Sequence, residues 1–362
     1  MSIEGAGTAV LVLSLLLAAC GTSPSTPPGA SGTAAPGAKA SAIAAPATGA
    51  TPTPTPSISP RVATYLDDAL DVMQANSINR YKVDWTALRA DILRAAATAR
   101  TISDTHPLIK QALSRLGDHH SLFLEAQEAT AGEQGTNPAP EPPTVQLVDG
   151  RFGYVAVPGY FGLGQDLANR YGTEMQRQIQ AVDRRHPCGW VVDLRGNPGG
   201  NMWPMLVGVG PILGDGKAGS WIDADGNVSA WAYVDGQATS DADVVGEVIG
   251  EPYRLADPGA PVAVLFGGDT ASSGEIIAIS FVGRPQARSF GSDSYGATTA
   301  NSGFPLSDGA LIFLTTAVDA DRTGKTYGAA LVPDVQVGGD NDTPGPVPTE
   351  ALQWLGGQSA CR

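Results

Sequence analysis

The sequence predicts an α/β protein in which a small helical lobe precedes an α/β core. Residues 1–60 contain only two charged side chains, no aromatic residue and nine of the 28 prolines, so the globular part begins near residue 60. The roughly 300 residues that follow are enough for one large domain and an accessory lobe. Within them, apolar side chains recur with a helical period over 62–73, and the apolar runs at 189–194 and 262–266 each lead into a glycine-containing turn.

The N-terminus has the character of an export signal. Residues 8–19 form an uncharged apolar run that is short for a membrane span and matches the core of a signal peptide. The run ends in Leu-Ala-Ala-Cys, which resembles the bacterial lipobox, so we expect removal of residues 1–19 and lipidation of Cys20. This indicates an exported bacterial lipoprotein of the cell envelope, on the outer face of the membrane or in the periplasm. Glu4 and the lack of Lys or Arg near it leave open an ordinary secretory signal with a coincidental cysteine.

Residues 20–59 are expected to form a disordered tether. They consist mostly of Ala, Gly, Ser, Thr and Pro, so no large apolar surface is available to offset the entropy of ordering them. An exported protein can form disulfides, and Cys188 and Cys361 are the two cysteines that are left beside Cys20. A disulfide between them is plausible, but the sequence leaves the pairing open.

Three amphipathic helices are predicted in a lobe that spans residues 60–125. The first follows from the apolar spacing over residues 62–73. The second begins after Asp84, whose carboxylate can cap it. The third begins near Thr105 and has Pro107 in its first turn, where proline is tolerated.

Charge and histidine content exclude several functions. A formal net charge of −14 and a pI near 4.6 argue against a nucleic-acid partner, because binding phosphates needs clustered Lys and Arg. His119 and His120 are adjacent, so their side chains point in different directions and are not expected to share a metal ion. We therefore expect neither a metal nor an organic cofactor. One histidine could simply cap the preceding helix while the other lies on the surface.

Ser272 and Ser273 lie between a predicted buried strand and a predicted helix. The strand is the run VAVLF at 262–266, and the turn GGDTA separates it from the serines. A serine at a helix N-terminus presents its hydroxyl beside free backbone N–H groups, as an acyl-transfer nucleophile requires. The alternative is that the two serines only cap the helix.

A second glycine-rich turn, RGNPGGN, occupies residues 195–201 after another apolar strand. It lacks the Lys-Ser/Thr pair of a P-loop and the GxGxxG spacing, so a phosphate site is not favoured. Backbone N–H groups exposed by glycines suit an oxyanion as well. The turn could also be a plain strand-to-helix connection in which Asp193 and Arg195 pair with each other.

Taken together, these segments resemble the tail-specific, C-terminal processing and tricorn-core family of serine peptidases. The resemblance runs from about residue 60 to 338. It rests on five segments in order: LGDHHS (116–121), GYVAV (153–157), DLRGNPGGN (193–201), TASSGE (270–275) and PD (333–334). It implies an α/β core of the ClpP/crotonase-like peptidase type at residues 151–340, followed by a C-terminal segment at 341–362.

The resemblance assigns the nucleophile to Ser272. It places the oxyanion donors on the N–H of Ser273 and on that of Gly199 or Gly200. In the processing branch of the family, a lysine lies 25 residues after the serine, but this chain has Ala297 there, so a Ser-Lys dyad is not expected.

The tricorn-like branch of the family uses a histidine base, which corresponds to His120. An ordinary imidazole pKa near 6.5 suits the removal of a serine proton at neutral pH. A further residue should orient the imidazole. The acidic residue that the family has before the Pro-Asp segment is missing, which leaves Asn301 and Asp321 as candidates and Glu275 as a third.

Substrate recognition by a PDZ module is not expected. Where the processing proteases of the family insert one, this chain has only the roughly 30 residues of 122–152, which are rich in Gly, Pro and Glu. Within them, we predict a linker at 126–150. Specificity must then come from the core. Tyr160, Phe161 and Trp203 lie next to the motif segments and could line a pocket or simply pack in the core.

The sequence thus predicts an exported, lipid-anchored serine peptidase that acts on peptides or unfolded proteins. One alternative is a non-catalytic peptide-binding lipoprotein of the same fold. Another is a Ser-Lys processing protease that uses one of the five lysines of the chain from outside the motif. The sequence leaves the oligomeric state open.

Overall fold

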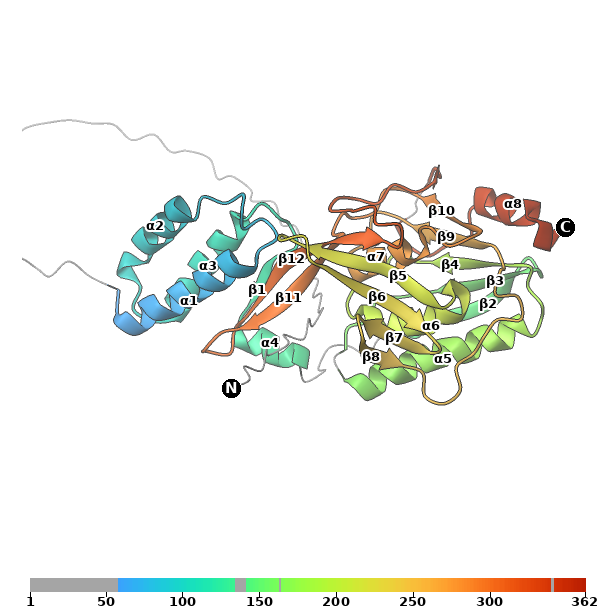
Figure 1. The fold of residues 1–362 in the computed structure, drawn as a ribbon, viewed down its shortest axis with the longest axis horizontal. Coiled ribbons are helices and arrows are strands. Elements are labelled where there is room, and N and C mark those ends of the chain that lie inside the picture. Colours follow the sequence, from blue (N-terminus) through green and yellow to red (C-terminus); the bar gives the residue numbers. More distant parts are fainter. Residues whose placement is uncertain (1–57, 134–140, 163, 340–341) are drawn as a thin grey trace, which may run out of the picture.

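A computed structural model describes residues 58–133, 141–162, 164–339 and 342–362. The predicted signal peptide, Cys20 and nearly all of the predicted tether lie outside these residues. Across the described ranges, no helix combines the length and the apolar character needed to cross a membrane. The described chain has a helical lobe at one end and an α/β core at the other (Figure 1).

The lobe contains the three predicted helices, which are α1 (Pro60–Asn76), α2 (Trp85–Ala95) and α3 (His106–Ser114). The Ser59 hydroxyl accepts the N–H of Val62 at 3.4 Å, and the Asp84 carboxylate accepts the N–H of Ala87 at 3.0 Å. These polar N-caps explain where α1 and α2 begin. Two short 3-10 helices precede α3, namely η1 (Ala96–Thr98) and η2 (Ser103–Thr105).

The lobe is completed by strands from much later in the chain. Leu66 and Ile92 are fully buried in one cluster with Ile312, which belongs to β12 (Leu311–Asp321). Two further strands pair with β12, namely β1 (Leu122–Leu124) and β11 (Thr299–Pro305). The lobe therefore combines the start of the described chain with a hairpin from its last quarter, as the two sequence colours in Figure 1 show.

The stretch 126–150, which the sequence predicts as a linker, contains two regular elements. They are α4 (Ala126–Glu133) and β2 (Thr144–Val148). β2 pairs antiparallel with the first strand of the core, so the sheet of the core begins before residue 151.

The core contains a six-stranded sheet in the order β13-β10-β9-β4-β3-β2. Its strands, apart from β2, are β3 (Phe152–Ala156), β4 (Gly189–Asp193), β9 (Val262–Phe266), β10 (Ala287–Gly291) and β13 (Val335–Gln336). All neighbours pair in parallel except β2 and β3. Every residue of β4 and β9 is buried, as their unbroken apolar runs predict for central parallel strands.

A second, antiparallel sheet of seven strands runs from the lobe across the core. In addition to β1, β11 and β12, it contains β5 (Gly216–Asp223), β6 (Val228–Val234), β7 (Gln237–Ser240) and β8 (Asp243–Glu247). Three helices pack around the space between the two sheets, namely α5 (Gln165–Asp183), α6 (Met202–Leu213) and α7 (Ser273–Phe281). A single buried cluster joins side chains of these helices to both sheets.

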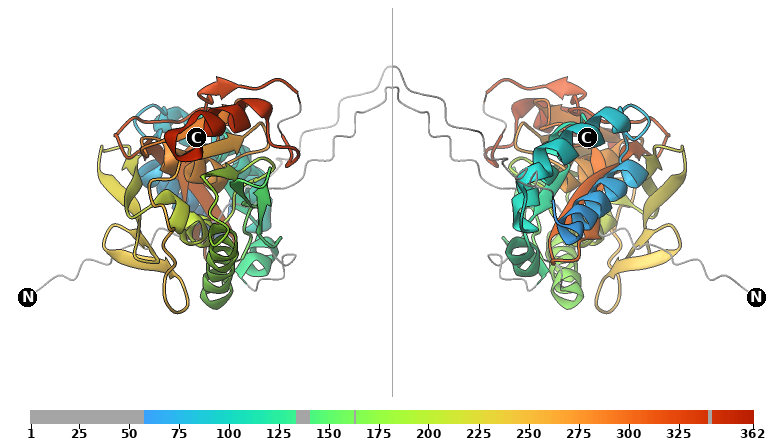
Figure 2. Two further views of the ribbon diagram at one scale, coloured as in Figure 1. Left: turned by 90° about the vertical axis from the view of Figure 1, so that its right-hand side faces the viewer. Right: turned by 90° about the vertical axis from the view of Figure 1, so that its left-hand side faces the viewer.

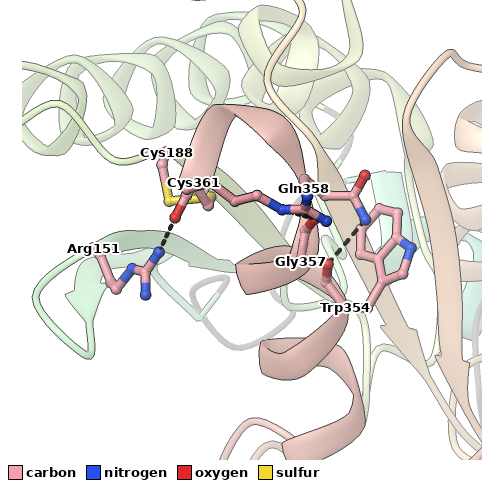
Figure 3. The surroundings of a disulfide bond; sticks show 7 residues. Arg151, Cys188, Trp354, Gly357, Gln358 and Cys361 are labelled. Atoms are coloured by element: carbon pink, nitrogen blue, oxygen red, sulfur yellow. Dashed lines mark hydrogen bonds between the residues drawn. A yellow bond between two sulfur atoms is a disulfide. The ribbon is translucent and has the colours of Figure 1, made fainter.

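The C-terminal helix α8 (Thr349–Gly357) covers the outer face of the six-stranded sheet, at the end of the molecule opposite the lobe (Figure 2). Beyond it, Cys361 lies in the 3-10 helix η3 (Ser359–Cys361) and forms a disulfide with Cys188 (Figure 3). The two Cα atoms are 5.0 Å apart, and the guanidinium of Arg151 donates to the carbonyl oxygen of Cys361. The last turn of the chain is thus fixed beside the start of β4.

Candidate active site

The two glycine- and serine-containing turns of the sequence analysis meet in the core. The carbonyl oxygen of Asn197 accepts the N–H of Ala271 at 2.9 Å. The Ser273 hydroxyl donates to the carbonyl oxygen of Gly200. The Thr270 hydroxyl donates to the carbonyl oxygen of Leu194 at 2.8 Å. These three bonds hold the turn after β4 against the turn after β9.

Ser272 adopts a backbone conformation that L-residues rarely have, with φ 50° and ψ −118°. Such strain is found mainly where the surrounding structure fixes a functional residue. Gly199 lies against it: a Cβ atom on this glycine would stand 3.0 Å from Cβ of Ser272 and 3.1 Å from the nitrogen of Ser273. Since Gly199 also has a φ of 106°, only glycine fits there without strain.

Backbone N–H groups surround the Ser272 turn, but they are not equally available. Ser273 is the first residue of α7, so its N–H takes no part in the hydrogen bonds of the helix. The bridge between Gly200 and Tyr160 uses the Gly199 carbonyl and the N–H of the residue after Gly200, which leaves the N–H of Gly200 outside the bridge. The N–H of Gly199, in contrast, donates to Oδ1 of Asn197 at 2.9 Å. These bonds therefore engage the N–H of Gly199 and leave those of Ser273 and Gly200 outside them.

Glu275 connects the Ser272 turn with the loop between β10 and β11. Its Oε2 accepts the N–H of Ser272 at 2.7 Å and the N–H of Ala297 at 2.8 Å. Its Oε1 accepts the N–H of Gly296 at 2.8 Å and the hydroxyl of Ser294. Burial raises the pKa of this fully buried carboxyl group, and the four donors oppose that shift. Glu275 does not orient the histidine; it ties together two segments of the site.

His120 is held by three hydrogen bonds. Its backbone N–H donates to Oδ1 of Asp118 at 3.1 Å, and its carbonyl oxygen accepts from Nδ2 of Asn301 at 2.7 Å. In its imidazole ring, Nδ1 lies 2.8 Å from Oγ1 of Thr299. Burial lowers the pKa of His120 from 6.5 to about 4, and the charge of Asp118 partly opposes this shift. The imidazole is therefore neutral at neutral pH, as a general base must be.

The two predicted orienting residues do other work. Asn301 contacts the backbone of His120, not its ring. Asp321 accepts hydrogen bonds from Thr323, Lys325 and Tyr327, so it stabilises the turn that follows it. The ring contact is made by Thr299, which the sequence analysis missed. A strand threonine carries no charge and no motif, so only the pairing of distant segments reveals it.

A cavity of about 580 Å³ lies between the lobe and the core, with His119 and His120 in its wall. Gly296 and Ala297 line the same cavity. The N–H groups of Ala297 and Ser272 donate to the same oxygen of Glu275, so this carboxylate links the serine to a residue of the cavity wall. Ser272 is thus linked through Glu275 to Ala297, and His120 contacts Thr299, two positions further along the chain.

The remaining predicted residues have structural surroundings. Ala297, at the position of the family lysine, is buried, and Lys325 lines a different cavity. Tyr160 and Trp203 are buried and make edge contacts with other aromatic rings. The ring centres of Trp203 and Trp221 are 5.9 Å apart. Phe161 is half-buried. Asp193 and Arg195 form a buried ion pair at 2.6 Å. In the part of the chain that the structure describes, no three His, Cys, Asp or Glu side chains gather as metal ligands do.

The fold and these two turns are those of the serine peptidase class. A serine at a helix N-terminus lies against a glycine turn on an α/β fold. The chain belongs to peptidase family S41, whose model matches residues 151–337. This confirms the family and the fold class that the sequence motifs predict.

Similar proteins extend the match into the lobe. A nisin-resistance protein of Lactococcus lactis subsp. lactis is 26% identical over 311 residues, which cover 83% of this chain and 89% of that protein. The structure of a lipoprotein from Streptococcus agalactiae has a TM-score of 0.65 at 23% identity and covers 76% of this chain and 92% of its own. The photosystem II D1 C-terminal processing protease has a TM-score of 0.55 at 17% identity and covers 83% of this chain and 98% of its own. These two structures share the fold.

Proposed function

We propose that this chain is a serine peptidase that cleaves peptides through an acyl-enzyme on Ser272, with His120 as the general base. The observation that carries the proposal is the position of Ser272: it stands in a strained turn at the N-terminus of α7, against Gly199. Membership of peptidase family S41 supports the same chemistry.

The proposed reaction begins when Oγ of Ser272 attacks the carbonyl carbon of the scissile peptide bond. Nε2 of His120 takes the hydroxyl proton; in the tautomer that this step requires, Nδ1–H donates to Oγ1 of Thr299, which lies 2.8 Å away. The N–H groups of Ser273 and Gly200 stabilise the oxyanion. His120 then passes the proton to the leaving amine, and a water molecule hydrolyses the ester in the same way.

The proposed site of action is the cell envelope. The apolar run at 8–19 and the following Cys20 support export and a lipid anchor, and residues 20–59 would hold the peptidase away from the membrane. A relative is named for nisin resistance, so nisin is the first substrate to test.

A fluorophosphonate probe tests the nucleophile. The wild type should be labelled, and Ser272→Ala should not be, while Ser114→Ala, which changes an exposed serine of the lobe, should be labelled like the wild type. Equal labelling of Ser272→Ala and the wild type would sink the assignment.

Peptide hydrolysis separates the alternatives that the sequence left open. If His120→Ala no longer cleaves nisin or a peptide library that the wild type cleaves, the result supports His120 as the base. If the wild type binds these peptides but cleaves none of them, the result supports a non-catalytic peptide-binding protein. A Ser-Lys mechanism requires instead that alanine in place of one of the five lysines abolishes cleavage, namely Lys39, Lys82, Lys110, Lys217 or Lys325.

A further inference from the structure

A cavity of about 770 Å³ lies at the opposite end of α7 from Ser272. Its floor is apolar: Val264 and Phe266 of β9, Phe281 of α7 and Leu331 are all nearly fully buried. None of these side chains takes part in the proposed chemistry. A concave site of this size with an apolar floor is typical of ligand-binding sites.

Two cations line this cavity without an anionic partner. The guanidinium of Arg288 lies 6.0 Å from the ring centre of Phe290, and the ammonium of Lys325 lies 5.0 Å from the ring centre of Tyr327. Among the described residues, neither cation forms an ion pair, and both side chains are exposed. The chain as a whole has a net charge of −14, but the wall of this cavity carries two cations that form no ion pair in the described part of the chain.

The other charged groups of the cavity are already engaged. The guanidinium of Arg284 is buried and donates to backbone carbonyl oxygens, among them those of Ile212 and Ala260. The carboxylate of Asp334 accepts the N–H and the hydroxyl of Ser289. The cations that remain for a ligand are therefore those of Arg288 and Lys325.

We propose that this cavity is a second peptide-binding subsite, which takes an apolar side chain together with an adjacent carboxylate. The apolar floor binds the side chain, and Arg288 and Lys325 bind the carboxylate through charge-assisted hydrogen bonds. The carboxylate is either the C-terminus of the peptide or the side chain of an acidic residue beside the apolar one.

The subsite adjoins the cavity that contains His120. Gly328 lines both cavities, so the two cavities share one residue of their walls. One peptide can therefore occupy the subsite and continue past Gly328 towards His120. In this respect the inference rests on the proposed function, because it makes the bound peptide the substrate of that site.

Binding is measured by fluorescence anisotropy with full-length Ser272→Ala, so that no substrate is consumed. Three N-terminally dansylated peptides are compared: one that ends in leucine with a free carboxylate, its C-terminal amide, and an amide with glutamate next to leucine. We expect the double charge reversal Arg288→Glu/Lys325→Glu to weaken carboxylate-dependent binding by about tenfold or more. Lys217→Glu, an exposed charge reversal on β5, is the matched control and should leave binding unchanged.

The comparison of the three peptides also tests the subsite without any substitution at the cavity. Tighter binding of the free acid than of its amide assigns the carboxylate to the C-terminus, and tighter binding of the glutamate peptide assigns it to a side chain. Equal binding of all three peptides, or equal affinity in the double variant and in Lys217→Glu, overturns the proposal. So does the binding of decanoate with no binding of any peptide, since the ligand is then a lipid. Fluorophosphonate labelling of Ser272 is independent of all these outcomes.

Discussion

Oγ1 of Thr299 lies 2.8 Å from Nδ1 of His120, so a neutral hydroxyl occupies the place beside the imidazole where many serine peptidases have a carboxylate. A hydroxyl can hold the ring in one orientation, but it accommodates either tautomer and adds no negative charge to stabilise an imidazolium. Thr299 is in this sense a positioning residue.

Replacement of Thr299 by valine should lower kcat/KM for peptide cleavage by about tenfold to a hundredfold, because the imidazole loses its fixed orientation. Thr299→Ser keeps the hydroxyl and should restore most of the activity. Steady-state kinetics of both variants test this, with melting temperatures measured alongside. If serine and valine reduce kcat/KM equally, the hydroxyl does not position His120.

The pH profile should report the low pKa of His120. Since burial lowers this pKa to about 4, the imidazole stays neutral far below pH 6.5. The acid limb of kcat/KM should therefore fall near pH 4, whereas an ordinary histidine would place it near 6.5. The same pKa shift affects stability. The unfolded chain takes up a proton on His120 near pH 6.5, whereas the folded chain takes it up only near pH 4. His120 therefore lowers the free energy of unfolding as the pH falls from 6.5 to 4. An acid limb at 6.5 would contradict the lowered pKa of this half-buried histidine.

Glu275→Gln should reduce both stability and labelling of Ser272. The carboxylate accepts hydrogen bonds from Ser272, Ser294, Gly296 and Ala297, and an amide nitrogen cannot accept those made to the oxygen it replaces. The expected loss is a few kcal/mol in the free energy of unfolding and a slower reaction with the fluorophosphonate probe. Glu174→Gln, at an exposed ion pair of α5, is the control and should change neither quantity.

Asp319→Asn should stabilise the protein at neutral pH. Asp319 is completely buried, and the Trp221 indole, the side chain that opposes the effect of burial on its pKa, forms no well-oriented hydrogen bond with either carboxylate oxygen. Burial raises its pKa well above the usual value, so the folded chain keeps a proton that the unfolded chain loses above about pH 4. Stability is therefore lost as the pH rises through this window, and the amide removes the loss. Melting temperatures at pH 4 and pH 7 should show a gain that appears mainly at pH 7.

Asp321→Asn gives the matched contrast on the same strand. Hydrogen bonds from Thr323 and Tyr327 lower the pKa of Asp321, so its charged form stabilises the fold at neutral pH. The amide should lower the melting temperature at pH 7. A gain in both variants would contradict the assignment of opposite charge states.

Removal of the disulfide should destabilise the core. The bond between Cys188 and Cys361 joins residues 173 positions apart, and replacing either cysteine by serine should cost about 2–5 kcal/mol of unfolding free energy. A reductant should lower the melting temperature of the wild type but not that of Cys188→Ser. Equal effects of the reductant on both proteins would show that another thiol is responsible.

The sequence is sufficient for the elements whose signals are local. α1 follows from helical periodicity, the start of α2 follows from Asp84 as its cap, and β4 and β9 follow from unbroken apolar runs. The turns at Gly199 and Ser272 are recognisable because their glycines and serines are placed in family motifs.

Residues that act through distant pairing could not be found in this way. Thr299 reaches His120 only because β11 returns to the lobe, 179 positions along the chain. β2 could not be predicted in its Gly- and Pro-rich stretch, because a short edge strand has too few residues to show an alternation of apolar and polar side chains. The antiparallel strands β5 to β8 depend likewise on their neighbours.

β12 passes without interruption from one hydrophobic cluster into another. Ile312 and Leu314 belong to the cluster of the lobe, and Ala317 belongs to the cluster of the core. The lobe is consequently no separable domain: a cut after residue 125 would remove α1 to α3 and leave half of a strand with an uncovered apolar face. Loss of α1 to α3 would leave Ile312 and Leu314 without their packing partners unless β12 were shortened as well.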